Sequence, residues 1–168
     1  DTIDGGAGAS DTAVYTGNFA QYTITRATDS EPLTITDSRS SGDGEDTVSN
    51  TEILEFADQT ARVVDAGGYA DIPTAVAAAA SGDVVLINTA ETVSVSLAND
   101  IATKNLSFSG ASVDTIKDTA SNISSSSIDL TANGFTRYDT LEVSGSGTVT
   151  LDASQLGGRA LTLTGTFE

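Results

Sequence analysis

Acidic residues at close spacing beside glycines are the part of this sequence best suited to chemistry. The segment Gly5-Gly6-Ala7-Gly8 lies between Asp4 and Asp11. Glycines allow sharp turns that point backbone carbonyls inward, and the aspartates add carboxylates. Ca²⁺ takes six to eight oxygen ligands, so the pattern predicts calcium contacts from Asp4, Gly6, Gly8 and Asp11, with stacked turns supplying the rest. A glycine-rich turn without metal is the alternative.

A second acidic group follows in the sequence. It contains Asp37, Asp43, Glu45 and Asp46, with Glu52 six residues further on. Acids at alternating positions with glycine between them can converge on one cation, so we predict that Asp37, Asp43, Asp46 and Glu52 bind a structural Ca²⁺. The spacing differs from that of an EF-hand, which requires D-x-D-x-D-G with Glu at position 12. A solvated acidic loop is the alternative, because runs of charge usually face water.

The amino-acid composition excludes several classes of function. The 168 residues include 24 acids, 7 bases, no His and no Cys, for a formal net charge of −17. Such a chain lacks the basic surface of nucleic-acid-binding proteins and the cationic face of peripheral membrane proteins. Disulfides, thiolate nucleophiles, Ser-His-Asp triads and ordinary zinc sites are also excluded. No run of 18 apolar residues is present, so no membrane insertion is expected. Bound cations would offset the repulsion between the many negative charges of the chain, which again predicts Ca²⁺ as the cofactor.

The elements that must position these acids are mostly strands. Alternation predicts strands at Thr12–Tyr15, Phe19–Thr25 and Leu33–Asp37, and Val48, Ile53, Leu54 and Phe56 anchor one or two more. We place a boundary at Asp65–Gly68, which gives two domains, 1–63 and 64–168.

The second domain contains the one predicted helix, near residues 72–80. Asp71 suits its N-cap, Pro73 its first turn, and Gly82 the left-handed position after its end. Val84–Ile87 follows as a continuous apolar strand. Further short strands are predicted at Thr92–Leu97, Asn105–Ser109, Ser127–Leu130, Thr140–Val143, Thr148–Leu151 and Ala160–Thr164.

The first domain resembles a known family. The stretch Gly5 to Gly17, followed by Tyr22-Thr23-Ile24, is similar to the segment that closes a calcium-binding repeat array in RTX (hemolysin-type) secreted proteins, although its first turn holds one residue more than the repeat G-G-x-G-x-D-x-U-x. The stretch Gly42 to Asp58 is similar to the family's D-G-x-D-T-L-x-N-x-E-x-L-x-F-A-D-G. The resemblance covers residues 1–60 and implies a calcium-dependent bacterial protein, usually exported by a type I secretion system.

The second domain resembles the opening of right-handed parallel β-helix proteins. In these, a short capping helix precedes A-x-x-G-D-x-V-x-V and the first coil, as in residues 64–87, and residues 97–110 are similar to the second coil. A helix over an open solenoid end covers apolar surface and unpaired strand edges. We therefore predict an all-β fold, with an RTX-type β-roll end and short β-strand region leading into a right-handed parallel β-helix-like solenoid with one capping helix. A β-sandwich is the alternative.

The predicted function is that of a non-enzymatic, calcium-dependent structural module in a large secreted or cell-surface bacterial RTX protein, such as an adhesin, surface-layer protein or filament component. A fragment of a carbohydrate-active β-helix enzyme and a carbohydrate-binding adhesion module are the alternatives. Expected partners are calcium and either self-association or a cell-surface glycan. The chain begins inside a motif, at Asp1, and is expected to be a piece of a larger protein. The groups available for catalysis are scattered: Asp114, Lys117, Asp118, Asp129, Arg137, Asp139 and Asp152.

Overall fold

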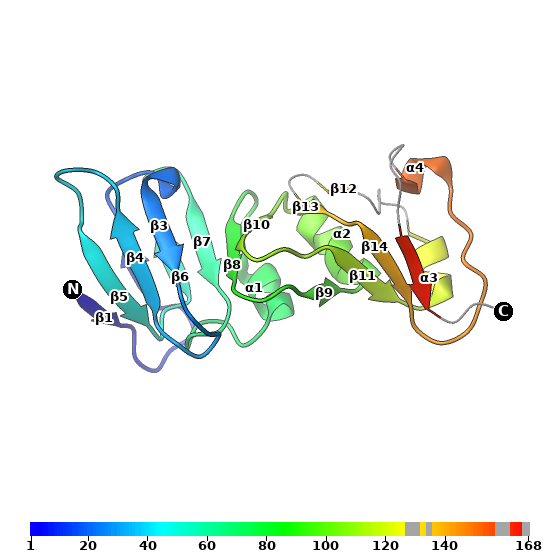
Figure 1. Ribbon diagram of the computed structural model, residues 1–168, viewed down its shortest axis with the longest axis horizontal. Helices are drawn as coiled ribbons and strands as arrows, with labels where there is room; N and C mark the ends of the chain where they lie inside the picture. The colour runs from blue at the N-terminus through cyan, green and yellow to red at the C-terminus, as the bar shows by residue number, and fades with distance from the viewer. Residues whose placement is uncertain (127–131, 134–135, 157–161, 166–168) are drawn as a thin grey trace.

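The computed structural model describes residues 1–126, 132–133, 136–156 and 162–165. They form a mainly β structure whose elements succeed one another along the long axis of the molecule (Figure 1). The first part contains β1 (Thr2–Asp4), β2 (Thr12–Val14), the 3₁₀ helix η1 (Phe19–Gln21), β3 (Tyr22–Thr25), β4 (Leu33–Asp37), β5 (Glu45–Ser49), β6 (Ile53–Glu55) and β7 (Thr60–Val63). The second part contains α1 (Ile72–Ala78), β8 (Val84–Ile87), β9 (Thr92–Val93), α2 (Val95–Thr103), β10 (Ser107–Gly110), β11 (Thr115–Asp118), α3 (Ala120–Ser124), β12 (Ala132–Asn133), β13 (Thr136–Arg137), β14 (Thr140–Val143), α4 (Ala153–Leu156) and β15 (Thr162–Gly165).

The larger sheets combine strands that are distant in sequence. The first sheet has the order β1-β5-β4-β3, the second β10-β8-β7-β6-β2 and the third β15-β14-β11-β9. Strand β1 runs parallel to β5 and β2 runs parallel to β6, with Thr2 opposite Thr47 and Thr12 opposite Ile53. The segment from β1 to β2 is therefore stacked on the segment from β5 to β6. This stacking places the first glycine turn beside the turn at Asn50.

The first core lies between the first and second sheets. Alternate residues of β4 are buried, as expected for a strand with one face on a core. The ring of Phe56 stacks on Tyr15 at 5.3 Å between centroids and meets the edge of Phe19 at 5.2 Å. Phe19 was expected to begin a strand, but it begins η1 instead. The reason is local capping, because the side-chain oxygen of Gln21 accepts a hydrogen bond from the backbone N–H of Asn18 at 2.8 Å.

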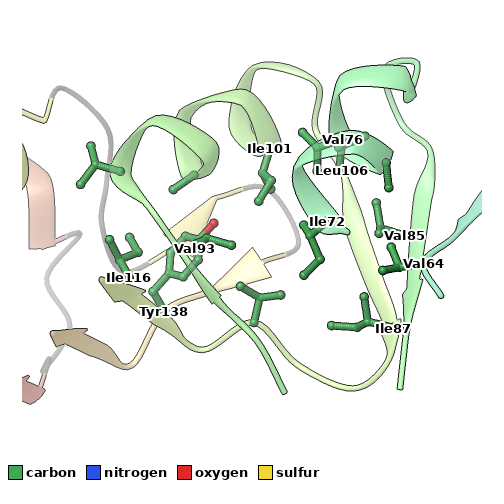
Figure 2. Close-up of a cluster of buried hydrophobic side chains, with 14 of the residues drawn as sticks. Val64, Ile72, Val76, Val85, Ile87, Val93, Ile101, Leu106, Ile116 and Tyr138 are labelled. Atoms are coloured by element: carbon green, nitrogen blue, oxygen red, sulfur yellow. The ribbon is translucent and has the colours of Figure 1, made fainter. Parts of the chain in front are cut away.

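Strand β8 is shared by both parts of the molecule. Val84 and Leu86 pack into the first core, whereas Val85 and Ile87 pack into a second core that extends towards β14 (Figure 2). A strand with both faces buried needs apolar residues at every position, which explains the continuous apolar sequence of β8. The predicted strand is confirmed. It also pairs in parallel with β7, so the second sheet contains strands from both sides of the predicted boundary.

Helix α1 begins and ends close to the predicted residues. The side chain of Asp71 accepts a hydrogen bond from Thr74 N at 2.8 Å, which confirms its role as the N-cap. The helix ends at Ala78, and Gly82 (φ 88°) adopts its left-handed conformation in the turn before β8, not directly after the helix. The ammonium group of Lys104 caps the C-terminal end instead, because it donates to backbone carbonyls there.

One helix was predicted, but the described residues also contain α2, α3 and α4, which were not predicted. The strand expected at Thr92–Leu97 stops at Val93, and α2 begins at Val95 because the hydroxyl of Ser94 accepts a hydrogen bond from Leu97 N at 3.1 Å. The buried face repeats with the helical period over Val95, Ala98 and Ile101. Within the described residues, no helix has the length and apolar character needed to cross a membrane.

The remaining strand predictions have mixed outcomes. Strand β14 matches Thr140–Val143, and β10 begins two residues later than expected. The residues of Thr148–Leu151 form no strand, because Thr150 N donates to the hydroxyl of Ser124 at 2.9 Å and not to a neighbouring strand. The prediction at Ser127–Leu130 and the start of Ala160–Thr164 lie outside the described residues.

Tyr138 offers a test of the second core. Its side chain is completely buried beside Val93 and Ile116 (Figure 2), and its hydroxyl has no hydrogen-bond partner. A buried hydroxyl without a partner loses its hydration and gains nothing in return. We expect Tyr138→Phe to stabilise the protein by about 1 kcal/mol, which raises the midpoint of thermal unfolding by about 2–4 °C. Calorimetry measures the shift, and a lower midpoint would contradict this reading of the core.

Candidate metal centre

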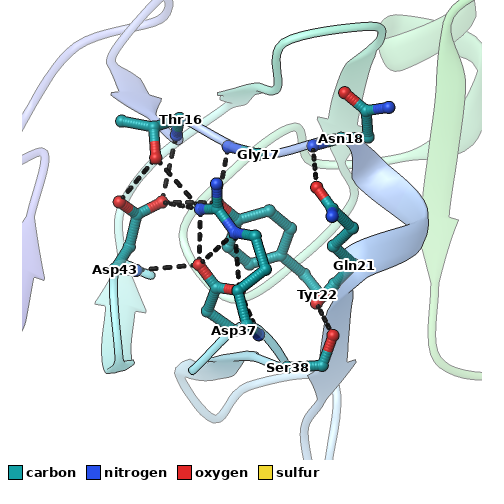
Figure 3. A network of polar contacts seen from close by, with 9 residues as sticks. Thr16, Gly17, Asn18, Gln21, Tyr22, Asp37, Ser38 and Asp43 are labelled. Atoms are coloured by element: carbon teal, nitrogen blue, oxygen red, sulfur yellow. Dashed lines mark hydrogen bonds and ion pairs between the residues drawn. The ribbon is translucent and has the colours of Figure 1, made fainter. Parts of the chain in front are cut away.

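The acidic loop between β4 and β5 is organised around Asp37. The carboxylate of Asp37 is fully buried and accepts hydrogen bonds from the backbone N–H groups of Arg39 (2.9 Å) and Asp43 (2.8 Å) (Figure 3). The guanidinium of Arg39 donates to both carboxylate oxygens of Asp37, with its Nε at 3.0 Å from each. These bonds with Arg39, together with the backbone donors, hold the pKa of Asp37 well below its ordinary value. Asp37 is therefore an ionised carboxylate with a full set of donors.

Asp43 approaches the same guanidinium from the other side of the loop. Arg39 Nη2 lies 3.2 Å from Asp43 Oδ2, and Thr16 donates to the carboxylate through its N–H (3.0 Å) and its hydroxyl (2.9 Å). The hydroxyl of Tyr22 also donates to Oδ2. The bond from Tyr22, followed by those from Thr16, lowers the pKa of Asp43. The structure therefore brings Asp37 and Asp43 together, as the sequence predicted, around a cation that belongs to the chain itself.

Arg39 is the functional group of this loop that the sequence analysis missed. Its guanidinium also donates to the hydroxyls of Thr16 (3.0 Å) and Tyr22 (2.7 Å), so it binds four side chains of the loop and its surroundings. A signal was present, since Arg39 is the one basic residue between Arg26 and Arg62 in a strongly acidic stretch. A planar group with several donors suits two carboxylates better than a point charge does.

Asp46 and Glu52 bond to other residues than those of this cluster. Asp46 is buried in β5, where its carboxylate lies 2.9 Å from the amino group of Asp1. Its neighbour Glu45 is exposed, because successive side chains of a strand point to opposite faces. Glu52 follows β5 in the turn towards β6 and is also buried. The four predicted ligands of the second site therefore do not converge on one position.

The first glycine turn holds Asp4 and Gly6 against Asn50. Asp4 Oδ1 accepts hydrogen bonds from Asn50 Nδ2 at 2.8 Å and from Gly6 N at 3.0 Å. The bond from Asn50 and then that from Gly6 lower the pKa of this exposed carboxylate. Gly6 has a φ of 85°, in the region that favours glycine. This end of the turn is closed by its own hydrogen bonds.

The other end of the turn joins Gly8, Asp11 and Glu52. The backbone N–H of Asp11 donates to Glu52 Oε2 at 2.8 Å, so a residue predicted for the first site contacts one predicted for the second. Asp11 Oδ2 is buried and has no hydrogen-bond partner. A Cβ on Gly8 would lie 2.4 Å from this oxygen, so the backbone of the turn approaches the carboxylate closely. The backbone of Asp11 thus bonds to the Glu52 carboxylate beneath a glycine turn, while the side-chain oxygen Asp11 Oδ2 is left without a donor.

The described residues contain no group of three or more acidic, His or Cys side chains placed to hold a metal ion. A site at Asp11 and Glu52 would therefore depend on backbone carbonyls for most of its ligands.

In comparisons with known proteins, no family model, no curated protein and no solved structure matches this chain.

Proposed function

We propose that the chain is a non-enzymatic structural module of a large secreted or cell-surface bacterial protein, and that its second part is a short parallel β-solenoid capped by α1. The solenoid is supported by the regular register of the parallel strands. In the second sheet Ala61 pairs with Val84 and Val84 with Ser107, so each step is 23 residues. In the third sheet Thr92, Thr115, Thr140 and Thr162 are successive partners, which gives steps of 23, 25 and 22 residues. Stacked coils of similar length produce such a near-constant number of residues between paired strands in each sheet.

The polar groups between these strands serve the structure. Lys117 forms an ion pair with Glu142 at 2.6 Å across β11 and β14. Asp118 accepts hydrogen bonds from Thr119 N (2.8 Å), Asn122 Nδ2 (2.7 Å) and Val95 N (3.1 Å), and it thereby fixes the starts of α2 and α3. Lys117 and Asp118 are two of the scattered residues that the sequence offered for catalysis, and these contacts give both of them a structural role.

Calcium dependence belongs to the same proposal, and the unpartnered Asp11 Oδ2 is the observation that carries it. A buried carboxylate oxygen without a donor is destabilising unless a cation or water completes it. Asp11, Glu52 and the backbone carbonyls of Gly5–Gly8 would hold the ion, and these hard oxygen donors suit Ca²⁺. The ion would supply positive charge to a chain with a net charge of −17. It would also fix the first turn onto the β5–β6 turn.

Thermal unfolding with added Ca²⁺ tests this proposal. Because an ion that binds only the folded state stabilises it, Ca²⁺ at a hundredfold excess over its Kd should contribute about 2.7 kcal/mol and raise the unfolding midpoint by about 5–11 °C. Asp11→Asn should remove most of this rise, because it replaces the unpartnered oxygen by a neutral amide.

Glu55→Gln is the matched control for Asp11→Asn. It removes one negative charge from an exposed position in β6, so it should leave the response to Ca²⁺ intact. Mg²⁺ at equal concentration should have a much smaller effect, because it demands octahedral geometry and loses its water reluctantly. An unfolding midpoint that is the same in excess chelator and in millimolar Ca²⁺ would contradict the calcium part of the proposal.

A further inference from the structure

A cavity of about 720 Å³ lies between α1, α2 and β9. Its volume is in the range of pockets that bind small molecules, about 300–1,000 Å³. Strand β9 stands at the end of the third sheet, where it pairs with β11 on one side and with no described strand on the other. Both residues of β9, Thr92 and Val93, line the cavity.

One wall of this cavity is apolar. It is formed by Val64, Ile72, Val76, Val93 and Leu97, four of which belong to the second core (Figure 2). Apolar groups of a ligand placed here would lose contact with water, as the core side chains do. Ala77 also lines the cavity, and it is exposed on α1.

The rim of the cavity is negative. It carries Asp65, Asp71, Glu91 and Asp100 against one basic residue, Lys104. The carboxylate of Asp71 is engaged as the N-cap of α1, and Asp65 interacts electrostatically with Arg26. The carboxylates of Glu91 and Asp100 have neither a hydrogen bond nor an ion pair with any described residue.

Lys104 does not offset this charge for a ligand. Its ammonium group donates to the carbonyls of Val76 (2.7 Å), Ala77 (2.9 Å) and Ala79 (2.9 Å). An ammonium group has three N–H donors, and all three are used at the C-terminal end of α1. The cavity therefore combines an apolar wall, two unpaired carboxylates and no free donor cation.

We propose that this cavity binds a small organic cation with an apolar body. The ammonium group of the ligand lies beside Glu91 and Asp100, and its body lies against the apolar wall. Anionic ligands are disfavoured by the same carboxylates. The proposal does not depend on calcium binding at the glycine turn, because it uses none of those residues.

Tryptamine is a suitable probe for the full chain. The protein contains no Trp, so indole fluorescence comes from the ligand alone and its anisotropy reports binding. The neutral 3-methylindole and the anionic indole-3-acetate have the same ring and serve as matched ligands. We expect tryptamine to bind most tightly, 3-methylindole less tightly and indole-3-acetate least. Equal affinity for the three indoles, or no binding of tryptamine at millimolar concentration, would overturn the proposal.

Variants locate the binding. Glu91→Gln and Asp100→Asn should each weaken tryptamine binding about two- to five-fold, as expected for a partly exposed charge pair, and leave 3-methylindole unaffected. Ala77→Phe should block both ligands by filling the cavity from an exposed helix position. Glu55→Gln removes the same charge elsewhere and should change nothing. Circular dichroism establishes that each variant is folded, and a folded Ala77→Phe that still binds tryptamine normally would place the ligand outside this cavity and overturn the proposal.

Discussion

Arg39→Gln should lower the unfolding temperature and make the acidic loop responsive to Ca²⁺. The substitution removes the guanidinium that bonds to both oxygens of Asp37 and lies 3.2 Å from Asp43 Oδ2. Two neighbouring carboxylates are then left without their cation, and one of them has no exposed side-chain surface. Millimolar Ca²⁺ should raise the unfolding midpoint of the variant more than that of the wild type, because the vacated position lies between oxygen ligands. Calorimetry of wild type and variant, with and without Ca²⁺, measures both effects.

The pH dependence of stability gives a second readout of the same substitution. In the wild type the pKa of Asp37 is lowered by Arg39, so its contribution to stability is present above the unfolded pKa of about 3.9 and is lost as the pH falls through the folded value. Without Arg39 the two carboxylates repel each other, and protonation of one relieves the repulsion. The variant should therefore gain stability relative to wild type as the pH falls from 7 towards 4.

Lys117→Gln is the control for loss of a positive charge. Lys117 pairs with Glu142 at the surface, where both side chains are well exposed, so its loss should cost no more than about 1 kcal/mol and add no calcium response. If Arg39→Gln unfolds at the same temperature as Lys117→Gln and responds to Ca²⁺ no more than Lys117→Gln does, the guanidinium is not the cation of this loop.

The sequence identified which acidic residues belong to the candidate sites, but it did not predict correctly which of them lie together. Asp37 and Asp43 meet as predicted because they flank one hairpin loop, and such proximity follows from chain order. Asp46 lies inside β5, where its carboxylate pairs with the amino group of Asp1 and not with Arg39. Glu52 meets Asp11 across 41 residues of sequence, through the parallel stacking of β2 on β6. Strand pairing between residues so far apart in the sequence leaves no signal in the neighbouring residues. The prediction from sequence spacing therefore assigned Asp11 and Glu52 to different sites.

Local signals were reliable where a single feature decided the structure. The N-cap Asp71 and the apolar run of β8 were read correctly, since each depends on neighbouring residues alone. Helix α2 was missed because its first turn, Val95-Ser96-Leu97, continues the alternation of β9 and only the hydroxyl of Ser94 separates the two. The mainly β class was predicted, but the register of the parallel strands was not readable from the sequence.

The ion pair between Arg62 and Asp83 should have the largest effect on the stability of the whole chain. Arg62 Nε lies 2.7 Å from Asp83 Oδ2, and the side chains are only 13% and 8% exposed. Arg62→Met leaves a buried carboxylate without its cation, which should cost about 3–5 kcal/mol and lower the unfolding midpoint by about 6–20 °C. Calorimetry measures the loss against the exposed control Lys117→Gln.

The position of this pair makes a second result predictable. Arg62 lies in β7 and Asp83 directly precedes β8, the strand whose two faces enter the two cores. Because Asp83 Oδ2 also accepts a hydrogen bond from Ala80 N at 2.9 Å, Asp83→Asn keeps part of that turn while removing the charge. The double variant Arg62→Met/Asp83→Asn should therefore be more stable than Arg62→Met alone, with a coupling of about 0.5–3 kcal/mol. A strictly additive double variant would mean that the two groups do not act as a pair.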